Sequence, residues 1–294
     1  MAKVTVRFFK IEKAHQNAPD LDAALKAAFE LGDKAADRER QVFDQTLRLE
    51  RLSTDQTFYA GEVVKKQTDD IPPEANDNGL ERLTLSEGGG VGHCIAFRYS
   101  VALRALAIQF DNRKVSVNRL LAYLREIDPT YDYRAEPIVR GDAWEKYNRG
   151  LPTKLELEIA QPQDLSVVEG KAASVIEATR NLADATNGPV ISVTVKMGRR
   201  KGSLAKDTID AILNHFSTGT GGSEDVRRLQ VTASDEDGAE VINFLNDLLR
   251  ESRDIDVPEG DPEGHYERRQ RWLKTCFDAH FEYISKVYGS SQVV

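Results

Sequence analysis

The sequence predicts an α+β fold of mixed, largely antiparallel sheets with flanking helices and a long C-terminal helix. Short runs in which apolar residues alternate, such as residues 3–11, indicate strands, and they are interspersed with segments whose apolar residues recur at helical spacing. The last of these segments, residues 264–288, is the longest. A chain of 294 residues has room for two domains, which we expect at 1–145 and 146–294, with the break within residues 142–152.

The elements of the first half follow in order. After the strand at residues 3–11, Asp20 occupies the N-cap position of a helix whose apolar residues recur at helical spacing. Residues 42–52 and 57–66 are typical of a strand pair joined by a short turn. The segments HCIAFRYS and RALAIQF are predicted to be two further strands, and the helix VNRLLAYLREI is predicted to be capped by Ser116.

The second half alternates strands and helices before the terminal helix. LELEIA is predicted to be a strand, SVVEGKAASVIEATRNLADA a helix capped by Ser166, and AKDTIDAILNHF a further helix. The strand at residues 228–233 meets the turn SDEDG, after which AEVINF is predicted to return as the second strand of a hairpin. The last helix carries an apolar stripe that we expect in the core or in a dimer interface, made of Tyr266, Leu273, Phe277, Phe281, Ile284 and Tyr288.

A cluster of cations stands out because the chain as a whole has a net charge of −8. The strand-like run VISVTV is followed by a turn that holds five cations and no acid, namely Lys196, Arg199, Arg200, Lys201 and Lys206. Gly198 and Gly202 allow the chain to turn there. Such a loop binds a polyanion, or it is an ordinary solvated turn, and the residues leave both interpretations open.

The terminal helix carries a second cationic group around Trp272. Its members are Arg268, Arg269, Arg271 and Lys274. A row of guanidinium groups beside an aromatic ring can bind a phosphate backbone or an acidic partner. Amphipathic helices also carry arginines on a solvated face, so a structural interpretation stays open here as well.

Signals for catalysis are weak. The five histidines show no metal-ligand spacing, and the glycine-rich SEGGGVGHC lacks the Lys-Ser or Lys-Thr of a phosphate-binding loop. Cys94 and Cys276 are expected to be buried free thiols. We therefore expect no enzyme activity, no metal and no cofactor. Asp164, Glu169 and Lys171 leave a metal-dependent nuclease as a minor alternative.

The sequence also shows no stretch typical of a membrane helix or a signal peptide. No stretch reaches the roughly 18 apolar residues of a membrane helix, and the opening residues MAKVTVRFFK carry no signal-peptide apolar block. A cytoplasmic location is the expectation.

Four segments, taken in order, resemble the RexA-type phage-exclusion proteins and related bacterial anti-phage defence proteins. They are YRAEPIVRGDAWEKYNRGLPTKLELEIA, VISVTVKMGRRKGSLAKDTIDAIL, LQVTASDEDGAEVI and the terminal aromatic helix, and the resemblance extends from about residue 86 to the end. It implies a homodimer that binds double-stranded DNA with little sequence preference and signals to a membrane-protein partner, without catalysis. The implied DNA contacts are Lys196, Arg199, Arg200, Lys201 and Lys206, together with Arg140. The acidic net charge departs from the family's pattern.

Two functions of different classes follow. The leading one is a sequence-non-specific DNA-binding component of a phage-exclusion or anti-phage defence system, in which cations neutralise backbone phosphates. The alternative is a non-catalytic interaction or regulatory subunit, whose basic loop and aromatic helix dock an acidic partner or a second copy of the chain.

Overall fold

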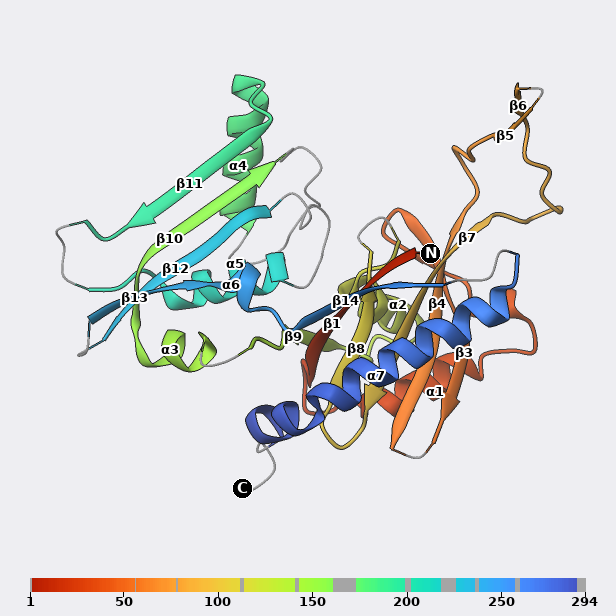
Figure 1. The fold of residues 1–294 in the computed structure, drawn as a ribbon, viewed down its shortest axis with the longest axis horizontal. Coiled ribbons are helices and arrows are strands. Elements are labelled where there is room, and N and C mark those ends of the chain that lie inside the picture. Colours follow the sequence, from red (N-terminus) through yellow and green to blue (C-terminus); the bar gives the residue numbers. More distant parts are fainter. Residues whose placement is uncertain are drawn as a thin grey trace.

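The computed structural model has a mixed α+β fold with antiparallel sheets and a long C-terminal helix, as the sequence predicts (Figure 1). The structure describes residues 2–55, 57–77, 79–111, 114–140, 143–160, 173–198, 202–217, 226–235, 238–256 and 260–289. No helix within these ranges is both long and apolar enough to span a membrane.

The larger sheet is built mainly by the first half of the chain. Its strands are β1 (Ala2–Lys13), β2 (Arg40–Val42), β3 (Gln45–Thr54), β4 (Phe58–Gln67), β7 (Val91–Ser100), β8 (Ala105–Phe110), β9 (Tyr133–Pro137) and β14 (Arg250–Ile255). The order is β14-β1-β8-β7-β4-β3-β2, and β9 pairs with the second half of β1. Every pair is antiparallel.

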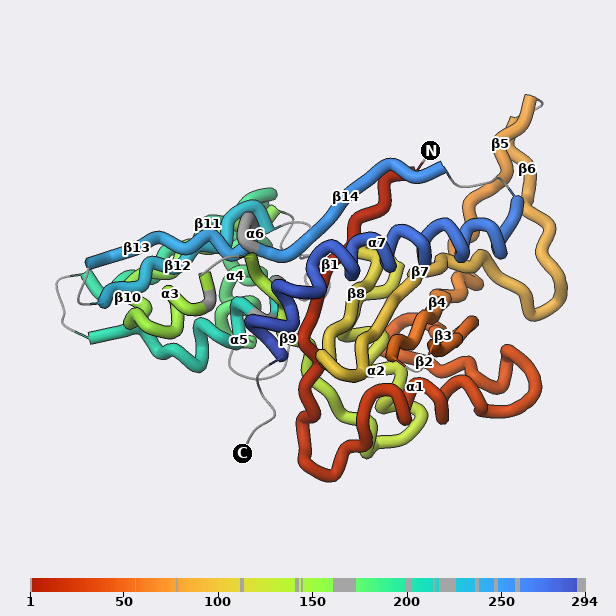
Figure 2. Tube along the Cα trace, turned by 60° about the horizontal axis from the view of Figure 1, so that its bottom comes forward, coloured from red at the N-terminus to blue at the C-terminus, as the bar shows by residue number. Residues whose placement is uncertain are grey.

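Helices cover both faces of this sheet (Figures 1 and 2). They are α1 (Leu21–Phe29) and α2 (Val117–Ile127) on one face and α7 (Pro262–Tyr288) on the other, with a short 3-10 helix, η1 (Ala35–Arg38), before β2. Side chains alternate between the faces along β1, so Phe9 and Ile11 join the core under α1 and α2 while Val6 and Phe8 join the core under α7. The result is three layers with the sheet in the middle.

Local signals predicted most of these elements, with two differences. The Ser116 hydroxyl accepts a hydrogen bond from Arg119 N, which confirms the cap of α2. Asp20 does occupy the N-cap position of α1, but its carboxylate lies 3.0 Å from Lys13 Nζ and caps no backbone N–H. The single strand predicted at residues 42–52 is wrong, because the chain turns back at Phe43, where φ is 52°, and separates β2 from β3.

The smaller sheet contains β10 (Leu151–Ala160), β11 (Val190–Lys196), β12 (Val226–Asp235) and β13 (Gly238–Asn243), in the order β11-β10-β12-β13. The predicted hairpin is confirmed, since β13 pairs with β12. The helices beside this sheet are α3 (Ala143–Arg149), α4 (Ala173–Thr186), α5 (Lys206–Ser217) and the short α6 (Phe244–Asp247). Ser166, the predicted cap of the first long helix here, lies outside the described residues.

The two faces of the smaller sheet differ in character. One face is apolar, and its residues, such as Leu157 and Leu229, share a buried core with Ile212 of α5. On the other face, Glu156 pairs in register with Gln230 and Thr194, and none of these polar side chains is fully buried. A small hairpin of β5 (Glu74–Asn76) and β6 (Gly79–Glu81) forms a projecting arm at the far side of the larger sheet (Figure 1).

The last segments of the chain return to the larger sheet. β14 pairs with β1, and Leu273, Phe277 and Ile284 of α7 are buried in the core beneath that sheet. Strands from the first half of the chain therefore cover the apolar stripe of the terminal helix. The stripe itself is confirmed as core for these residues, whereas Phe281 is 41% exposed. The division into domains at 145/146 stays a prediction.

Candidate nucleic-acid interface

The basic turn after β11 is described only at its two ends. Lys196 is exposed at the end of β11 beside its register partner Lys154, and Gly198 adopts a φ of 62°, which glycine tolerates without strain. Arg199, Arg200 and Lys201 lie outside the described residues. Lys206 begins α5 and is half-buried.

The side chain of Lys206 contacts α3. Its Nζ donates a hydrogen bond to Asn148 Oδ1 at 2.9 Å and lies 5.0 Å from the centroid of the Tyr147 ring. Tyr147 in turn donates to Asp210 Oδ1 of α5. These contacts hold α3 against α5, so they give Lys206 a structural role within the described residues.

Arg140 connects the segment between the sheets to β14. Its guanidinium donates to Arg250 O at 2.8 Å and to Glu251 Oε1 at 2.6 Å. The same Glu251 oxygen lies 2.8 Å from His280 Nε2 of α7. The charge of Arg140 is therefore already balanced by the Glu251 carboxylate, and the role of Arg140 as a DNA contact stays a prediction.

The cations of α7 divide between two sides of the helix. Arg269 points to the sheet, where its Nη1 lies 3.7 Å from Glu62 Oε1, and the two side chains are 12% and 4% exposed. Lys274 is exposed and pairs with Asp278, one turn further along the helix. Arg268 and Arg271 are exposed, and no hydrogen bond or ion pair joins either guanidinium to another described residue.

The side of α7 that carries Arg268 and Arg271 faces β14 across a hollow of about 420 Å³. Its lining from α7 is Arg268, Arg271, Trp272 and Thr275, which helical spacing places on one face, and from β14 and the residue after it Arg253, Asp254, Ile255 and Asp256. We call this hollow the β14–α7 groove. Because β14 pairs with β1 and α7 packs on the same sheet, residues from both ends of the chain position it.

Arg253 was missed by the sequence analysis. Its guanidinium carbon lies 5.7 Å from the centroid of the Trp272 ring, its side chain is exposed, and no ion pair joins it to another described residue. Residues 250–255 read as an ordinary charged stretch, RESRDI. Strand alternation could have grouped Arg253 with Glu251, but nothing local indicates that this strand lies beside α7.

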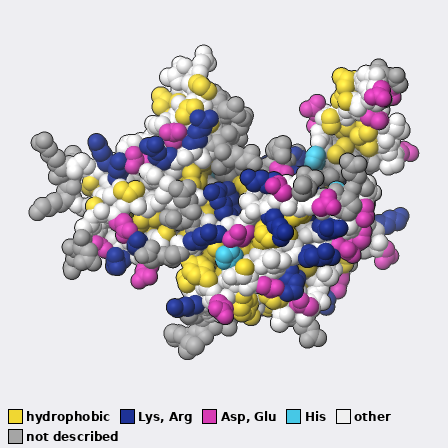
Figure 3. Space-filling view, viewed as in Figure 1, with side chains coloured by type: hydrophobic (Ala, Val, Ile, Leu, Met, Phe, Trp, Pro, Cys, Tyr) yellow, Lys and Arg dark blue, Asp and Glu magenta, His cyan; other side chains and the backbone are white. Residues whose placement is uncertain are grey.

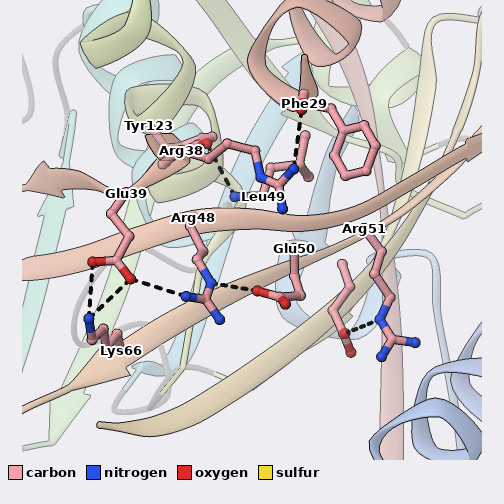
Figure 4. A network of polar contacts seen from close by, with 10 residues as sticks. Phe29, Arg38, Glu39, Arg48, Leu49, Glu50, Arg51, Lys66 and Tyr123 are labelled. Atoms are coloured by element: carbon pink, nitrogen blue, oxygen red, sulfur yellow. Dashed lines mark hydrogen bonds and ion pairs between the residues drawn. The ribbon is translucent and has the colours of Figure 1, made fainter. Parts of the chain in front are cut away.

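The electrostatics of the groove combine three arginines with two aspartates. Figure 3 shows Lys and Arg groups gathered along the face that carries α7, with Asp and Glu groups between them. Three cations elsewhere on the larger sheet are paired: Lys66 and Arg48 both contact Glu39, and Arg51 contacts Glu62 (Figure 4). The three arginines of the groove have no such ion pair among the described residues.

Titratable groups near α7 are shifted by burial. Burial raises the pKa of Glu62 above its ordinary value, and the nearby Arg51 and Arg269 offset this only in part. Burial also raises the pKa of the Cys276 thiol to about 12 and that of Cys94 above its usual range. Cys276 is buried and Cys94 half-buried, and both are free thiols. Neither is a thiolate nucleophile at neutral pH.

Within the described residues, no group of three or more His, Cys, Asp or Glu side chains could hold a metal ion. Asp164, Glu169 and Lys171, on which the nuclease alternative depends, lie outside those residues.

No protein-family model matches this sequence, and no curated protein matches it.

Proposed function

We propose that this protein binds double-stranded DNA along its phosphate backbone, without sequence preference, through the β14–α7 groove. The observation that carries the proposal is the set of three exposed arginines in the groove, Arg253, Arg268 and Arg271, none of which has an acidic partner among the described residues. An unpaired guanidinium gains more from a phosphate than one that must first leave a carboxylate.

Backbone binding fits the groove better than base reading does. Base recognition requires side chains held in a fixed bidentate geometry, whereas no described hydrogen bond fixes these three guanidinium groups. Phosphate contacts tolerate such freedom because every nucleotide offers the same oxygens. Lys196 and the cations of the basic turn, Arg199, Arg200 and Lys201, are further proposed phosphate contacts.

The resemblance to RexA-type proteins supports a cellular role in phage exclusion or anti-phage defence. In that role a homodimer bound to DNA signals to a membrane-protein partner, and the protein catalyses no reaction. Arg269 and Lys206 are not part of the proposed interface, because their charges are directed to Glu62 and to α3.

A second candidate is a module that docks an acidic peptide. β14 ends the larger sheet in the described part of the chain, and an end strand can accept a further strand through its backbone groups. Asp254 and Asp256 also line the groove, and their carboxylates can accept hydrogen bonds from the backbone N–H groups of a peptide, which a phosphate backbone does not offer.

The test is binding to unrelated duplexes of about 20 base pairs at 50 and 200 mM salt, measured by fluorescence anisotropy. We expect equal affinity for all sequences and, for about four neutralised phosphates, a loss on the order of 100-fold between the two salt concentrations. An absence of binding at 50 mM salt, or an affinity that ignores salt, would reject the proposal. Salt-dependent binding of a poly-glutamate peptide in place of DNA would favour the second candidate.

A further inference from the structure

The β5–β6 arm, residues 68–90, has no buried core of its own. None of its described residues is buried, and in the described part of the chain its two strands pair only with each other. Figures 1 and 2 show the arm extending away from the larger sheet. A two-stranded hairpin is at best marginally stable alone, so an arm of this kind gains stability when another surface covers it.

The arm contains a hollow in which apolar side chains are exposed to solvent. Its volume is about 780 Å³, and we call it the arm groove. Polar residues complete a lining whose apolar members are Ile71, Pro73, Leu80, Leu83 and Leu85. Leu80 is 74% exposed, so most of its apolar surface is in contact with water. An apolar group that fills the groove displaces that water and is thereby bound.

Phe43 presents an apolar knob that the fold does not cover. It is 77% exposed and is the first residue of the two-residue turn between β2 and β3, where Val42 pairs with Gln45. Its φ of 52° is a conformation that glycine adopts freely and a bulky residue does not. Exposure and backbone conformation therefore both disfavour phenylalanine here on grounds of stability. A contact with another molecule accounts for an aromatic residue at this position.

The turn at Phe43 and the arm leave the larger sheet at the same end. Thr46 of β3 pairs with Lys66 of β4, and Lys66 pairs with Gly92 of β7. The turn comes directly before β3 and the arm connects β4 to β7, so both lie beyond this end of adjacent strands. A single two-fold axis can therefore bring Phe43 of each copy of the chain to the arm groove of the other copy.

Charge complementarity favours the same pairing. Arg82 is the only cation of the arm, which carries six acids: Asp69, Asp70, Glu74, Asp77, Glu81 and Glu87. Two such arms repel each other, so each needs a cationic surface. Arg40 lies on β2, three residues before Phe43, and donates to the main-chain oxygens of Asp37 and Glu39 at 2.9 and 2.7 Å. No ion pair joins its guanidinium to a described carboxylate, so an acidic arm can balance its charge.

We propose that two copies of this chain associate by reciprocal contacts, in which Phe43 of each copy inserts into the arm groove of the other and the acidic arm lies beside the other copy's Arg40. Aromatic side chains seated in apolar pockets contribute most to protein–protein affinity. A homodimer belongs to the proposed function, and the inference adds the surface that forms it. That surface is separate from the β14–α7 groove, because β2 and β14 form opposite edges of the larger sheet.

Sedimentation velocity at protein concentrations from about 1 to 50 μM tests the association. We expect a dimer for the natural protein and a monomer for Phe43→Asp and for Leu80→Asp, because each change places a charge in the apolar contact. Aspartate tolerates positive φ, and Leu80 is exposed, so both variants should fold. The control Val241→Asp changes a side chain of β13 that is 59% exposed and belongs to neither surface, and it should leave the dimer intact. A monomeric natural protein, or a dimer that neither variant weakens, would overturn the inference.

A mixture of the two monomeric variants tests the reciprocal geometry. Phe43→Asp retains an intact arm groove and Leu80→Asp retains Phe43, so one of the two contacts can form between unlike copies and neither can form between like copies. With one variant fluorescently labelled, we expect a mixed dimer at about 50 μM that dissociates more readily than the natural one. A mixture that stays monomeric at this concentration would overturn the reciprocal contact.

Duplex binding by the same variants separates this inference from the proposed function. Monomeric variants that still bind DNA would support a dimer surface distinct from the β14–α7 groove. A natural protein that dimerises through Phe43 but binds no DNA would support the inference and reject the proposed function. Variants that stay dimeric but lose DNA binding would overturn the inference, since they would assign the arm and Phe43 to DNA.

Discussion

Two neighbouring arginines on α7, Arg268 and Arg269, have opposite surroundings. Arg269 faces the larger sheet and meets the buried carboxylate of Glu62, whereas Arg268 faces the β14–α7 groove without an acidic partner among the described residues. The cation on the sheet-facing side of the helix neutralises an acid, whereas the cations on the groove-facing side are the ones that we propose bind a ligand. A group of Lys and Arg residues in the sequence therefore identifies a basic surface patch only once the ion pairs of each side chain are known.

The largest effect on stability is expected from the apolar side chains on the sheet-facing side of α7. Phe277 is fully buried, and its ring centroid lies 6.0 Å from that of Phe8 and 5.1 Å from that of Phe58. Phe277→Ala should lower the free energy of unfolding by about 3–5 kcal/mol, because it removes a large side chain from a packed core. The urea midpoint measures this. A change below about 1 kcal/mol would mean that α7 does not hold the core together.

The two arginines themselves provide the next test. Arg269→Ala leaves Glu62 buried with Arg51 as its remaining partner, at 3.5 Å, and should cost about 3 kcal/mol of unfolding free energy. The matched control Arg268→Ala removes the same side chain from the solvated side and should change stability by no more than about 0.5 kcal/mol. Equal costs for the two variants would remove the distinction between the two sides of the helix.

Glu62 gives the sheet-facing side a pH dependence. Because burial raises its pKa above the ordinary 4.5, the folded state favours the protonated carboxyl. The stability that this group contributes is full below the unfolded pKa and is lost as pH rises through the folded pKa. The Glu62→Gln variant has no carboxyl group to ionise at this position, so its unfolding free energy does not fall in this way. From pH 4 to pH 8 the variant should therefore gain stability relative to the natural protein. Denaturant titrations at pH 4 and pH 8 measure this difference in unfolding free energy. A relative gain for the natural protein would show that Arg51 and Arg269 lower the pKa of Glu62 by more than burial raises it.

The smallest effect on stability is expected from the basic turn. Replacing Arg199, Arg200 and Lys201 by Glu should abolish DNA binding if these cations contact phosphate, while solvated loop charges contribute only about 0–1 kcal/mol each to folding. Gel shift and thermal denaturation of the same triple variant provide the two readouts. Retained DNA binding would mark the turn as an ordinary solvated loop, and unfolding would mark these cations as structural partners of acids.

The features that could be predicted from the sequence are those that local signals determine. The Ser116 cap, the β12–β13 hairpin and the helical stripe with Phe277 all depend on residues close together in the chain. It did not predict that β14 pairs with β1, since that contact joins segments separated by some 240 residues and leaves no local pattern. The groove depends on this pairing, so Arg253 could not be found beforehand.

Ion pairing escaped the sequence analysis for a related reason. Helical spacing shows that Arg268 and Arg269 point in different directions, but it does not show that Glu62 lies on the strand that one of them meets. The turn at Phe43 was missed because a bulky residue with positive φ carries no turn signal of the kind glycine gives.

The central claim is that the groove-facing cations of α7 bind DNA, and one paired measurement tests it most directly. Arg268→Glu/Arg271→Glu reverses two groove charges, and the control Lys26→Glu/Arg125→Glu makes the same change in net charge at exposed positions on α1 and α2, across the larger sheet. Duplex affinity at 50 mM salt should be lost for the groove variant and fall only slightly for the control, with both proteins folded. Equal losses in the two variants, or retained binding by the groove variant, would contradict the account.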